Sequence, residues 1–380
     1  MKKLLYQKVY DQLKLSIQEG KIPVGSKMPA ENELMAQFDV SSITLKKALE
    51  LLKKDGYISR RPRVGTFVIN ASPVSEQIET RMFDKPLFGC IMTNFDDTFG
   101  TTLLSGMLEH SDSKAHIIVK KSLGDTEREE EILQEFIEMN VAGILILPAS
   151  SKFVSPTLLE LASQKFPLVV IDRTLEGLPI SSISSDNTEA GRIITEKLFE
   201  LGHKHIGMIT STSPVSTLDS RVNGFIRGHA SFHTAFHSDY VFREIESVMP
   251  NSTVSIQTDI DKIAHFLNTH SEITALVATE YNIALLIKQA CNKLGKSIPA
   301  DLSVVCFDHP DNFFDTSAFQ FTHIKQAQYE IGVKAVDMLL NQVLKPDTIN
   351  KETLPPMLIE GDSVKMLKST SYLEVLFLSF

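Results

Sequence analysis

The sequence predicts an α/β protein in which a small, basic, mainly helical part precedes a large acidic part built on parallel sheets. The chain has 380 residues, enough for two or three domains. Residues 1–70 contain 13 Lys and Arg against 7 Asp and Glu, a net charge of +6, whereas the whole chain carries −9. From residue 87 onward, short apolar runs alternate with longer amphipathic stretches, a pattern typical of buried parallel strands covered by helices. The charge asymmetry predicts that the basic part faces a polyanion.

The composition argues against a membrane or secreted protein. No run of about 18 apolar residues occurs, so we expect no spanning helix. Residues 1–17 begin with two lysines, but polar residues interrupt the apolar ones, unlike a signal peptide. Cys90, Cys291 and Cys306 are scattered in apolar runs, which favours buried thiols in a reducing compartment. We therefore expect a cytoplasmic location.

Helical periodicity dominates the beginning of the basic part. Apolar residues at intervals of four predict a first helix with one buried stripe. The stripe consists of Leu5, Val9, Leu13 and Ile17. A second, short helix is expected over residues 30–38, with Leu34 and Phe38 pointing inward.

A third helix and a basic hairpin complete this part. Ser41 is a suitable N-cap for a helix that Gly56 ends. We expect its core-facing residues to be Ile43, Ala48, Leu49 and Leu52. Two short strands then surround a tip that contains Arg60, Arg61 and Arg63. Three helices and a hairpin describe a winged helix-turn-helix, whose third helix is expected in the major groove of DNA and whose wing is expected along the backbone or in the minor groove.

These residues resemble the gluconate-repressor (GntR) family of bacterial regulators over residues 3–70. The segments MPAENELMAQF, VSSITLKKALELL and RVGTFV match the family's spaced motifs in order. The resemblance implies a DNA-binding surface of Asn32, Ser41, Ser42, Thr44, Lys46, Lys47, Arg60, Arg61, Arg63, Gly65 and Thr66. Family arginines fall here on Asn32, Ser42 and Lys46, and the wing-tip glycine falls on Arg63, so the family's operator sequence does not transfer. The alternative is a solvated basic face that contacts nothing.

A linker is expected over residues 71–86, followed by two α/β lobes. The apolar runs include FGCIMT, AGILILP, FPLVVID, HIGMIT and LSVVCFD. About 280 residues of this pattern exceed what one sheet usually holds. The segments of residues 87–363 resemble, in order, the periplasmic-binding-protein-like sensor domain of the lactose/galactose-repressor family. A GntR head on such a sensor resembles the arabinose-repressor subgroup.

The resemblance implies two lobes joined by three crossover segments, with the ligand in the cleft between them. We expect one lobe over about residues 87–180 and 327–350, and the other over about 181–323 and 351–363. The crossovers are expected near Leu175–Ser182, Thr322–Gln326 and Asn350–Leu354. The role of residues 364–380 is not predicted.

The ligand of such lobes binds beyond the carboxyl ends of the strands. That rule points to loops that begin at Asn94, Pro148, Asp172, Ser211, Thr279 and Asp308. The resemblance implies that Arg221, Glu280, Asp308 and Gln326 contact the ligand, because they match ligand residues of the family. Polar groups for hydroxyls and aromatic rings for stacking complete the expected effector site with Phe95, Phe99, Asp172 and Arg173. Each has a structural alternative: a helix cap or ion pair for the aspartates, a structural bridge for Arg221, and core packing for the phenylalanines.

A metal site and an enzyme are the weaker readings. His229, His233 and His237 are spaced at i, i+4 and i+8 and would form one zinc-binding face only if one helix continued through them. His203 and His205 are expected to hydrogen-bond a turn. No phosphate loop, dinucleotide fingerprint, nucleophile elbow or HExxH motif occurs. We therefore predict no catalytic residues, no cofactor and no metal, and not the pyridoxal-phosphate domain found in one GntR branch.

Together these patterns predict a bacterial, nucleoid-associated transcription factor. Its partners would be double-stranded operator DNA, a small effector, in the resembling subgroup a monosaccharide such as arabinose, and a second copy of the chain. Residues 329–343 are one candidate dimer surface, although Ile331, Ala335, Met338 and Leu339 could equally face the core. Release from the operator by a bound sugar is expected. Corepression, or a response to a non-sugar metabolite, is the alternative.

Overall fold

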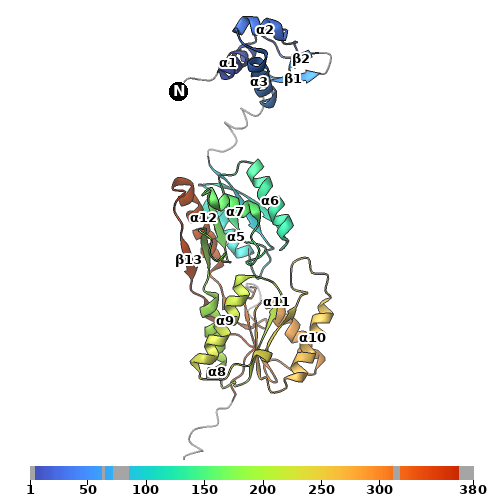
Figure 1. Ribbon diagram of the computed structural model, residues 1–380. Coiled ribbons are helices and arrows are strands. Elements are labelled where there is room, and N and C mark those ends of the chain that lie inside the picture. Colours follow the sequence, from blue (N-terminus) through green and yellow to red (C-terminus); the bar gives the residue numbers. More distant parts are fainter. Residues whose placement is uncertain (1–4, 62–64, 72–84, 311–316, 368–380) are drawn as a thin grey trace, which may run out of the picture. The chain divides into compact units, whose positions relative to one another are not determined.

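A computed structural model describes residues 5–61, 65–71, 85–310 and 317–367 (Figure 1). The chain divides into two compact units, Met1–Asp84 and Lys85–Phe380. Most of the expected linker and residues 368–380 lie outside the described residues. No helix in the described ranges is long and apolar enough to cross a bilayer.

The first unit is a three-helix head with a two-stranded antiparallel wing. Its elements are α1 (Leu5–Gln18), α2 (Glu31–Phe38), α3 (Ser42–Lys54), β1 (Ile58–Arg61) and β2 (Gly65–Val68). Ser41 caps α3, because its hydroxyl accepts a hydrogen bond from the Thr44 amide, as predicted. Val9, Leu13 and Ile17 of α1 are buried, whereas Leu5 at the start of the expected stripe is exposed.

One prediction about α3 was wrong. Ile43 is 81% exposed, and the buried residues of this helix are Leu45, Ala48 and Leu52. Leu45 and Ala48 are three residues apart and Leu52 follows four later, so these three share one helical face. Ile43 is two positions before Leu45 and therefore lies on the solvent side, where its apolar character misled the prediction.

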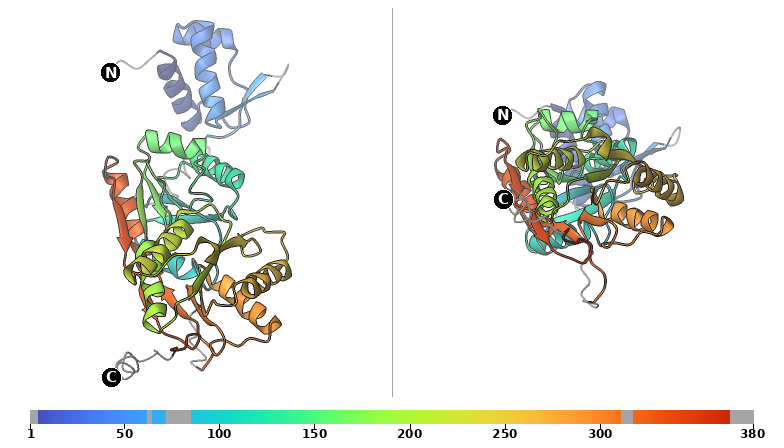
Figure 2. Two further views of the ribbon diagram at one scale, coloured as in Figure 1. Left: turned by 60° about the horizontal axis from the view of Figure 1, so that its bottom comes forward. Right: turned by 90° about the horizontal axis from the view of Figure 1, so that it is seen from below.

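The second unit contains two lobes, each a six-stranded sheet flanked by helices (Figures 1 and 2). The first sheet is entirely parallel, with the order β13-β7-β6-β5-β3-β4. Its elements are β3 (Leu87–Met92), α5 (Thr101–Ser111), β4 (His116–Lys121), α6 (Thr126–Glu138), β5 (Gly143–Ile146), α7 (Pro156–Ser163), β6 (Leu168–Ile171), β7 (Ser181–Ser185), α12 (Gln328–Leu344) and β13 (Lys351–Leu354).

The second sheet has the order β14-β12-β11-β10-β8-β9, and only β14 runs antiparallel to its neighbour. Its elements are α8 (Asn187–Glu200), β8 (Ile206–Ser211), α9 (Ser216–Ser231), η1 (Ser238–Tyr240), β9 (Val241–Ile245), α10 (Ile256–Thr269), β10 (Ala275–Ala278), α11 (Tyr281–Lys293), β11 (Ser303–Phe307), β12 (Thr322–Lys325) and β14 (Met357–Ile359). Cys90, Cys291 and Cys306 are buried, as expected from their apolar surroundings.

The chain crosses between the lobes three times, and two of the predicted crossings were misplaced. The first crossing follows β7, at residue 186, rather than Leu175–Ser182, and the third lies between β13 and β14, at residues 355–356, rather than Asn350–Leu354. Residues 181–185 and 351–354 therefore belong to the first lobe. Both strands were missed because SSISS and KETL lack an apolar run: β7 is a buried, serine-rich strand, and β13 is a half-exposed edge strand. The second crossing, at residues 326–327, is within one residue of the predicted segment.

The two lobes repeat one design of helix packing. In the first lobe, Gly106 of α5 and Gly332 of α12 lie against the backbone of the other helix. In the second lobe, Gly191 of α8 and Gly224 of α9 do the same. In each pair, one helix (α5 or α9) follows the strand of its lobe that comes first along the chain (β3 or β8). The two pairs therefore occupy corresponding positions in their lobes. Without side chains at these points, the two helices of each lobe approach to backbone contact.

The apolar face of α12 is internal. Ile331, Ala335, Met338 and Leu339 are buried against the first sheet. Of the two readings of residues 329–343, the core reading therefore holds for these four residues, and they are not available for a dimer contact.

Candidate functional site

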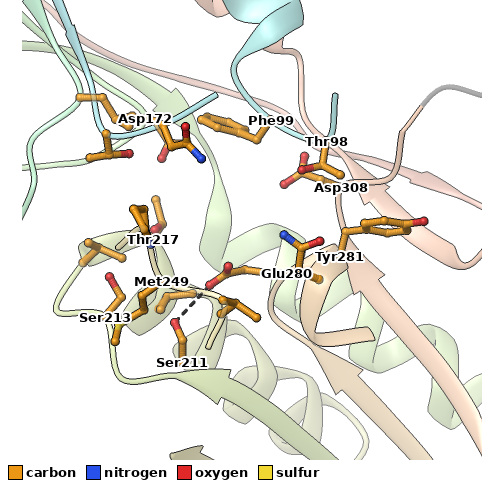
Figure 3. Close-up of a pocket in the computed structure, with 18 of the residues that line it drawn as sticks. Thr98, Phe99, Asp172, Ser211, Ser213, Thr217, Met249, Glu280, Tyr281 and Asp308 are labelled. Atoms are coloured by element: carbon orange, nitrogen blue, oxygen red, sulfur yellow. Dashed lines mark hydrogen bonds between the residues drawn. The ribbon is translucent and has the colours of Figure 1, made fainter. Parts of the chain in front are cut away.

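A cleft lies between the carboxyl ends of the strands of the two lobes. The cavity in it has a volume of about 180 Å³ and brings together all eight residues of the expected effector site (Figure 3). Asp172 and Phe99 approach it from the first lobe, and Thr217, Met249 and Glu280 from the second. Every expected strand-end loop contributes, because the carbonyls of Pro148 and Thr279 accept hydrogen bonds from Arg173 and Arg221.

Two aspartates occupy equivalent positions on opposite sides of the cleft. Asp172 follows β6 and Asp308 follows β11, each the fourth strand of its lobe along the chain. Both have a left-handed backbone, with φ of 63° and 62°, a conformation that aspartate tolerates better than most residues. Their amides donate to Ile183 and Ile324 of the next strand, at 2.8 and 2.9 Å. This kink turns each carboxylate away from its sheet and into the cleft.

Asp308 is connected to the crossover and to the other lobe. Nε2 of Gln326 donates to both oxygens of Asp308, at 3.1 and 2.9 Å. Gln328, at the start of α12, lies 3.4 Å from the same carboxylate and also donates to the Thr98 carbonyl. Gln328 was not predicted, since its signal in the sequence is only its position two residues after Gln326. It joins Asp308 of the second lobe to the Thr98 loop of the first lobe.

The carboxyl groups of the cleft hold protons more tightly than usual. Burial raises the pKa of Asp308 to about 7, although Arg221 and the Gln326 hydrogen bond oppose the shift. Burial also raises the pKa of Asp172 and of Glu280, which accepts a hydrogen bond from Ser211. A ligand that donates hydrogen bonds favours the ionised form of such groups.

Effector affinity is therefore expected to increase from about pH 6 to about pH 8, by up to about tenfold per pH unit for each proton released. Below pH 7 the Asp308 carboxyl is protonated and must ionise before it can accept fully from the ligand. Binding thus releases a proton near neutrality. Calorimetric titration in two buffers of different ionisation enthalpy measures that proton. An affinity that falls with rising pH would contradict the assignment.

The two arginines are already committed to protein partners. Nε of Arg221 donates to Asn187 at 2.8 Å, Nη1 donates to the Thr279 carbonyl at 2.5 Å, and the guanidinium stacks 4.2 Å from the Phe307 ring. Arg173 donates to the Pro148 carbonyl, and its Nε is buried without a partner. Asp172 Oδ1 and Gln326 Oε1 are buried acceptors without a partner in the structure. Both the bridging and the ligand-binding readings of Arg221 are compatible with this geometry.

Phe95 and Phe99 line the cavity and also pack against the core of the first lobe. The two alternatives for these rings are therefore not exclusive. Lining residues that sequence reasoning did not single out include Thr98, Ser213, Thr217, Met249 and Tyr281. Neutral side chains of this kind carry no pattern that distinguishes them from ordinary loop residues.

A loop of the first lobe caps a helix of the second. The residue that precedes α9 is Val215, whose side chain cannot cap. The amide of Ser216 instead donates to Oγ of Ser151 at 2.9 Å, and the Ser151 amide donates to the Pro214 carbonyl at 3.0 Å. Helix α6 of the first lobe holds this loop in place, because the buried carboxylate of Glu129 accepts a hydrogen bond from the Ala149 amide at 2.5 Å. Helix α9 also carries the cleft residues Thr217 and Arg221.

Ser151→Ala is expected to reduce effector affinity by roughly 2- to 30-fold, the equivalent of the about 0.5–2 kcal/mol that a lost N-cap costs. Ser151 of the first lobe caps α9 of the second, so the variant loses this cap only when the two lobes are in contact. Binding of the head to DNA without effector should therefore not change. Ser155→Ala is the matched control: Ser155 caps α7 from within the first lobe. It should lower the melting temperature and leave effector affinity unchanged. Equal effects of both variants on effector affinity would exclude an interlobe role.

Most of the expected DNA-binding residues of the head are exposed. Asn32, Ser41, Ser42, Lys46 and Lys47 are exposed at α2 and at the beginning of α3. Thr44 is half-buried and hydrogen-bonded to Ser41. The ammonium group of Lys47 lies 4.4 Å from the centre of the Tyr6 ring.

In the wing, Arg60 pairs with Glu31 at 3.3 Å, and Gly65 and Thr66 begin β2. Gly65 has a φ of 134°, in the range that favours glycine. Arg63 lies outside the described residues, and for Arg61 only the backbone is described, at the end of β1.

The histidines do not form one helical face. Helix α9 ends at Ser231, so only His229 of the spaced set lies on it, where it is buried and its Nδ1 donates to the Phe225 carbonyl. His203 holds a turn, as expected, through Thr274 at 2.9 Å and the Lys365 carbonyl at 3.2 Å.

Comparison with known proteins agrees with this architecture. Residues 5–68 match the family model described as bacterial regulatory proteins, gntR family, and residues 195–364 match a periplasmic binding protein-like domain. An arabinose metabolism transcriptional repressor of Geobacillus stearothermophilus is 27% identical over 91% of this chain and 93% of that protein. A protein of the same description from Halalkalibacterium halodurans is 23% identical over 88% of each.

A solved structure of similar fold is a LacI family transcriptional regulator from Enterococcus faecium with bound ribose. It has a TM-score of 0.61, is 22% identical, and covers 74% of this chain and 100% of its own. Residues 5–68 therefore form a gntR-type helix-turn-helix head, and the second unit has a periplasmic-binding-protein-like fold.

Proposed function

We propose that this chain, which joins a gntR-type head to a LacI-type sensor, is a transcriptional repressor of sugar-utilisation genes that a small sugar releases from its operator. The observation that carries the proposal is the combination of the two sites in one chain. An exposed recognition helix with a basic wing precedes a two-lobed domain whose cleft collects carboxylates, amides, arginines and aromatic rings. Relatives that cover nine-tenths of the chain are repressors of arabinose metabolism, and we propose no enzymatic activity.

The chemistry of the cleft favours a neutral monosaccharide over an anionic effector. Within the described part of the chain, the cationic lining residues are Arg173 and Arg221, and both already donate to carbonyls. Asp172 Oδ1 and Gln326 Oε1 are buried hydrogen-bond acceptors without a protein donor, and sugar hydroxyls can donate to them. A volume of about 180 Å³ is below the roughly 300–1,000 Å³ of sites for drug-sized ligands. Arabinose fits this class.

Repression then requires two heads and a change of their spacing. One winged helix contacts a half-site, so we propose a homodimer on a pseudo-palindromic operator. A ligand that contacts both lobes favours the closed cleft by its additional contacts there. A coupling free energy of about 1–3 kcal/mol would change operator affinity roughly 5- to 150-fold. The opposite sign, in which the ligand strengthens DNA binding, is the alternative.

Lys46→Ala is expected to weaken operator binding by roughly 5- to 150-fold, the equivalent of about 1–3 kcal/mol, because it removes a cation from the groove face of α3. Lys54→Ala is the matched control, since Lys54 is exposed in the last turn of the same helix. Fluorescence anisotropy with labelled duplex measures both. Effector binding should be unchanged in both variants, and equal loss of DNA and effector binding after Lys46→Ala would contradict the division of labour.

A thermal-shift series with neutral pentoses and hexoses, their phosphates and their acids tests the effector class. At 100 times its Kd, a ligand stabilises the folded domain by about 2.7 kcal/mol, which raises the melting temperature by several degrees. We expect such a shift with a neutral sugar. A shift produced only by phosphates or acids would overturn the proposed effector.

A further inference from the structure

Ile43 is an exposed apolar side chain for which the fold of the head gives no reason. It is 81% exposed at the second position of α3, while Leu45, Ala48 and Leu52 form the core face of that helix. A β-branched residue also lowers helix propensity slightly. Single exposed apolar residues are ordinary on protein surfaces. The position of Ile43 is what sets it apart.

The neighbours of Ile43 on α3 are the groups expected at DNA. Ser42 precedes it, and Lys46 and Lys47 follow at the spacings that place residues on the same side of a helix. The ammonium group of Lys47 lies over the Tyr6 ring. The other exposed side chains near the N-terminal end of α3 are those of Ser42, Ile43 and Lys46. In helix-turn-helix proteins, the N-terminal residues of the recognition helix are the ones that reach base edges.

An isoleucine at a base edge can recognise one chemical group. It has no hydrogen-bonding atom in its side chain, so it cannot read the donors and acceptors of guanine, cytosine or adenine. In the major groove, thymine alone among the four bases presents a methyl group, at C5. Contact between this methyl and Ile43 removes apolar surface of both from water. The other groove residues, Asn32, Ser42 and Lys46, are polar and read or hold other groups.

We propose that Ile43 is a specificity-determining residue that reads the C5 methyl group of a thymine in each operator half-site. The inference rests on the proposed function, because it requires that α3 enters the major groove. It assigns to Ile43 the choice of thymine at one base pair. Arginine-based readout of guanine, which this chain lacks at Asn32, Ser42 and Lys46, is thereby replaced in part by apolar readout.

The test begins with the full-length protein and a random duplex library. Selection of bound duplexes gives the preferred sequence. Each thymine of that sequence is then replaced, one at a time, by deoxyuridine, which keeps every hydrogen-bonding atom and lacks only the methyl group. For the unmodified protein we expect one position per half-site at which the replacement weakens binding about 4-fold, and both together about 16-fold. Ile43→Ala should bind the thymine and deoxyuridine duplexes equally.

Two controls make the result decisive. Leu15→Ala removes an apolar side chain that is 52% exposed on α1, and it should keep the sensitivity to the methyl group. The melting temperature of Ile43→Ala should equal or slightly exceed that of the unmodified protein, because the side chain makes no core contact and alanine has the higher helix propensity. Failure to select any sequence would defeat the proposed function itself. A selected sequence without a methyl-sensitive thymine, or an Ile43→Ala variant that keeps the sensitivity, would overturn this inference alone.

Discussion

Asp308→Ala is expected to abolish the response to the effector while operator binding remains. The carboxylate of Asp308 is buried at the end of β11 and accepts both hydrogen bonds from Gln326 and a longer one from Gln328. Its loss removes a ligand acceptor and leaves the buried amide of Gln326 without its partner, whereas Gln328 keeps its hydrogen bond to the Thr98 carbonyl. Hydrogen bonds to charged groups contribute about 1.5–3 kcal/mol each, so effector affinity should fall roughly 10- to 100-fold or more. Calorimetric titration with the sugar found by thermal shift measures the loss.

Asp308→Asn separates chemistry from backbone strain. At a φ of 62° alanine is strained by about 1–2 kcal/mol, whereas asparagine adopts this conformation readily. Both variants should lose effector affinity and the pH dependence near neutrality, but alanine alone should also lower the melting temperature. An Asp308→Asn protein that the sugar releases normally from its operator would remove Asp308 from the site.

Gly224→Ala should destabilise the second lobe strongly for a substitution that adds a single methyl group. A methyl group at this position would overlap the carbonyl oxygen of Thr188 and lie 2.8 Å from the Cα of Gly191. Both obstacles are backbone atoms, so α8 and α9 must separate rather than rotate a side chain. Overpacking of this kind costs about 1–3 kcal/mol or more, equivalent to a fall in melting temperature of several degrees. Differential scanning calorimetry gives the value directly.

The displacement should also reach the cleft, because α9 carries Thr217 and Arg221. Asn223→Ala is the matched control: Asn223 is the exposed neighbour on the same helix, and alanine there slightly improves helix propensity. A Gly224→Ala protein as stable as Asn223→Ala would show that the two helices are not held at backbone contact.

Strong local patterns made most of the fold predictable from the sequence. Ser41 identified the start of α3, and the apolar runs identified the central strands of both lobes. Prediction failed where burial and polarity disagree. The serines of β7 are buried because the strand lies between two neighbours, and Ile43 is exposed despite its apolar side chain. Neither the burial of these serines nor the exposure of Ile43 can be read from the neighbouring sequence, because each depends on which residues tertiary packing places beside it.

The site was predictable where strand ends carry charge. Asp172 and Asp308 each follow a run of buried apolar residues, and parallel topology brings such ends together. Gln328 and Ser151 were not predictable, because their importance lies in contacts with the other lobe. A glutamine or serine in a loop has many ordinary roles, and only the arrangement of the two lobes selects one of them.

The discontinuous make-up of the lobes has a consequence for synthesis of the protein. The head is a continuous segment that ends by residue 71, so all of its secondary structure leaves the ribosome early. The first lobe needs α12 and β13, and the second needs β14, all of which lie beyond residue 327. Contacts between segments this far apart in the chain form late and slowly. A nascent or truncated chain that stops before residue 327 would therefore contain the complete head and an incomplete sensor, so its single head would contact a half-site without responding to sugar.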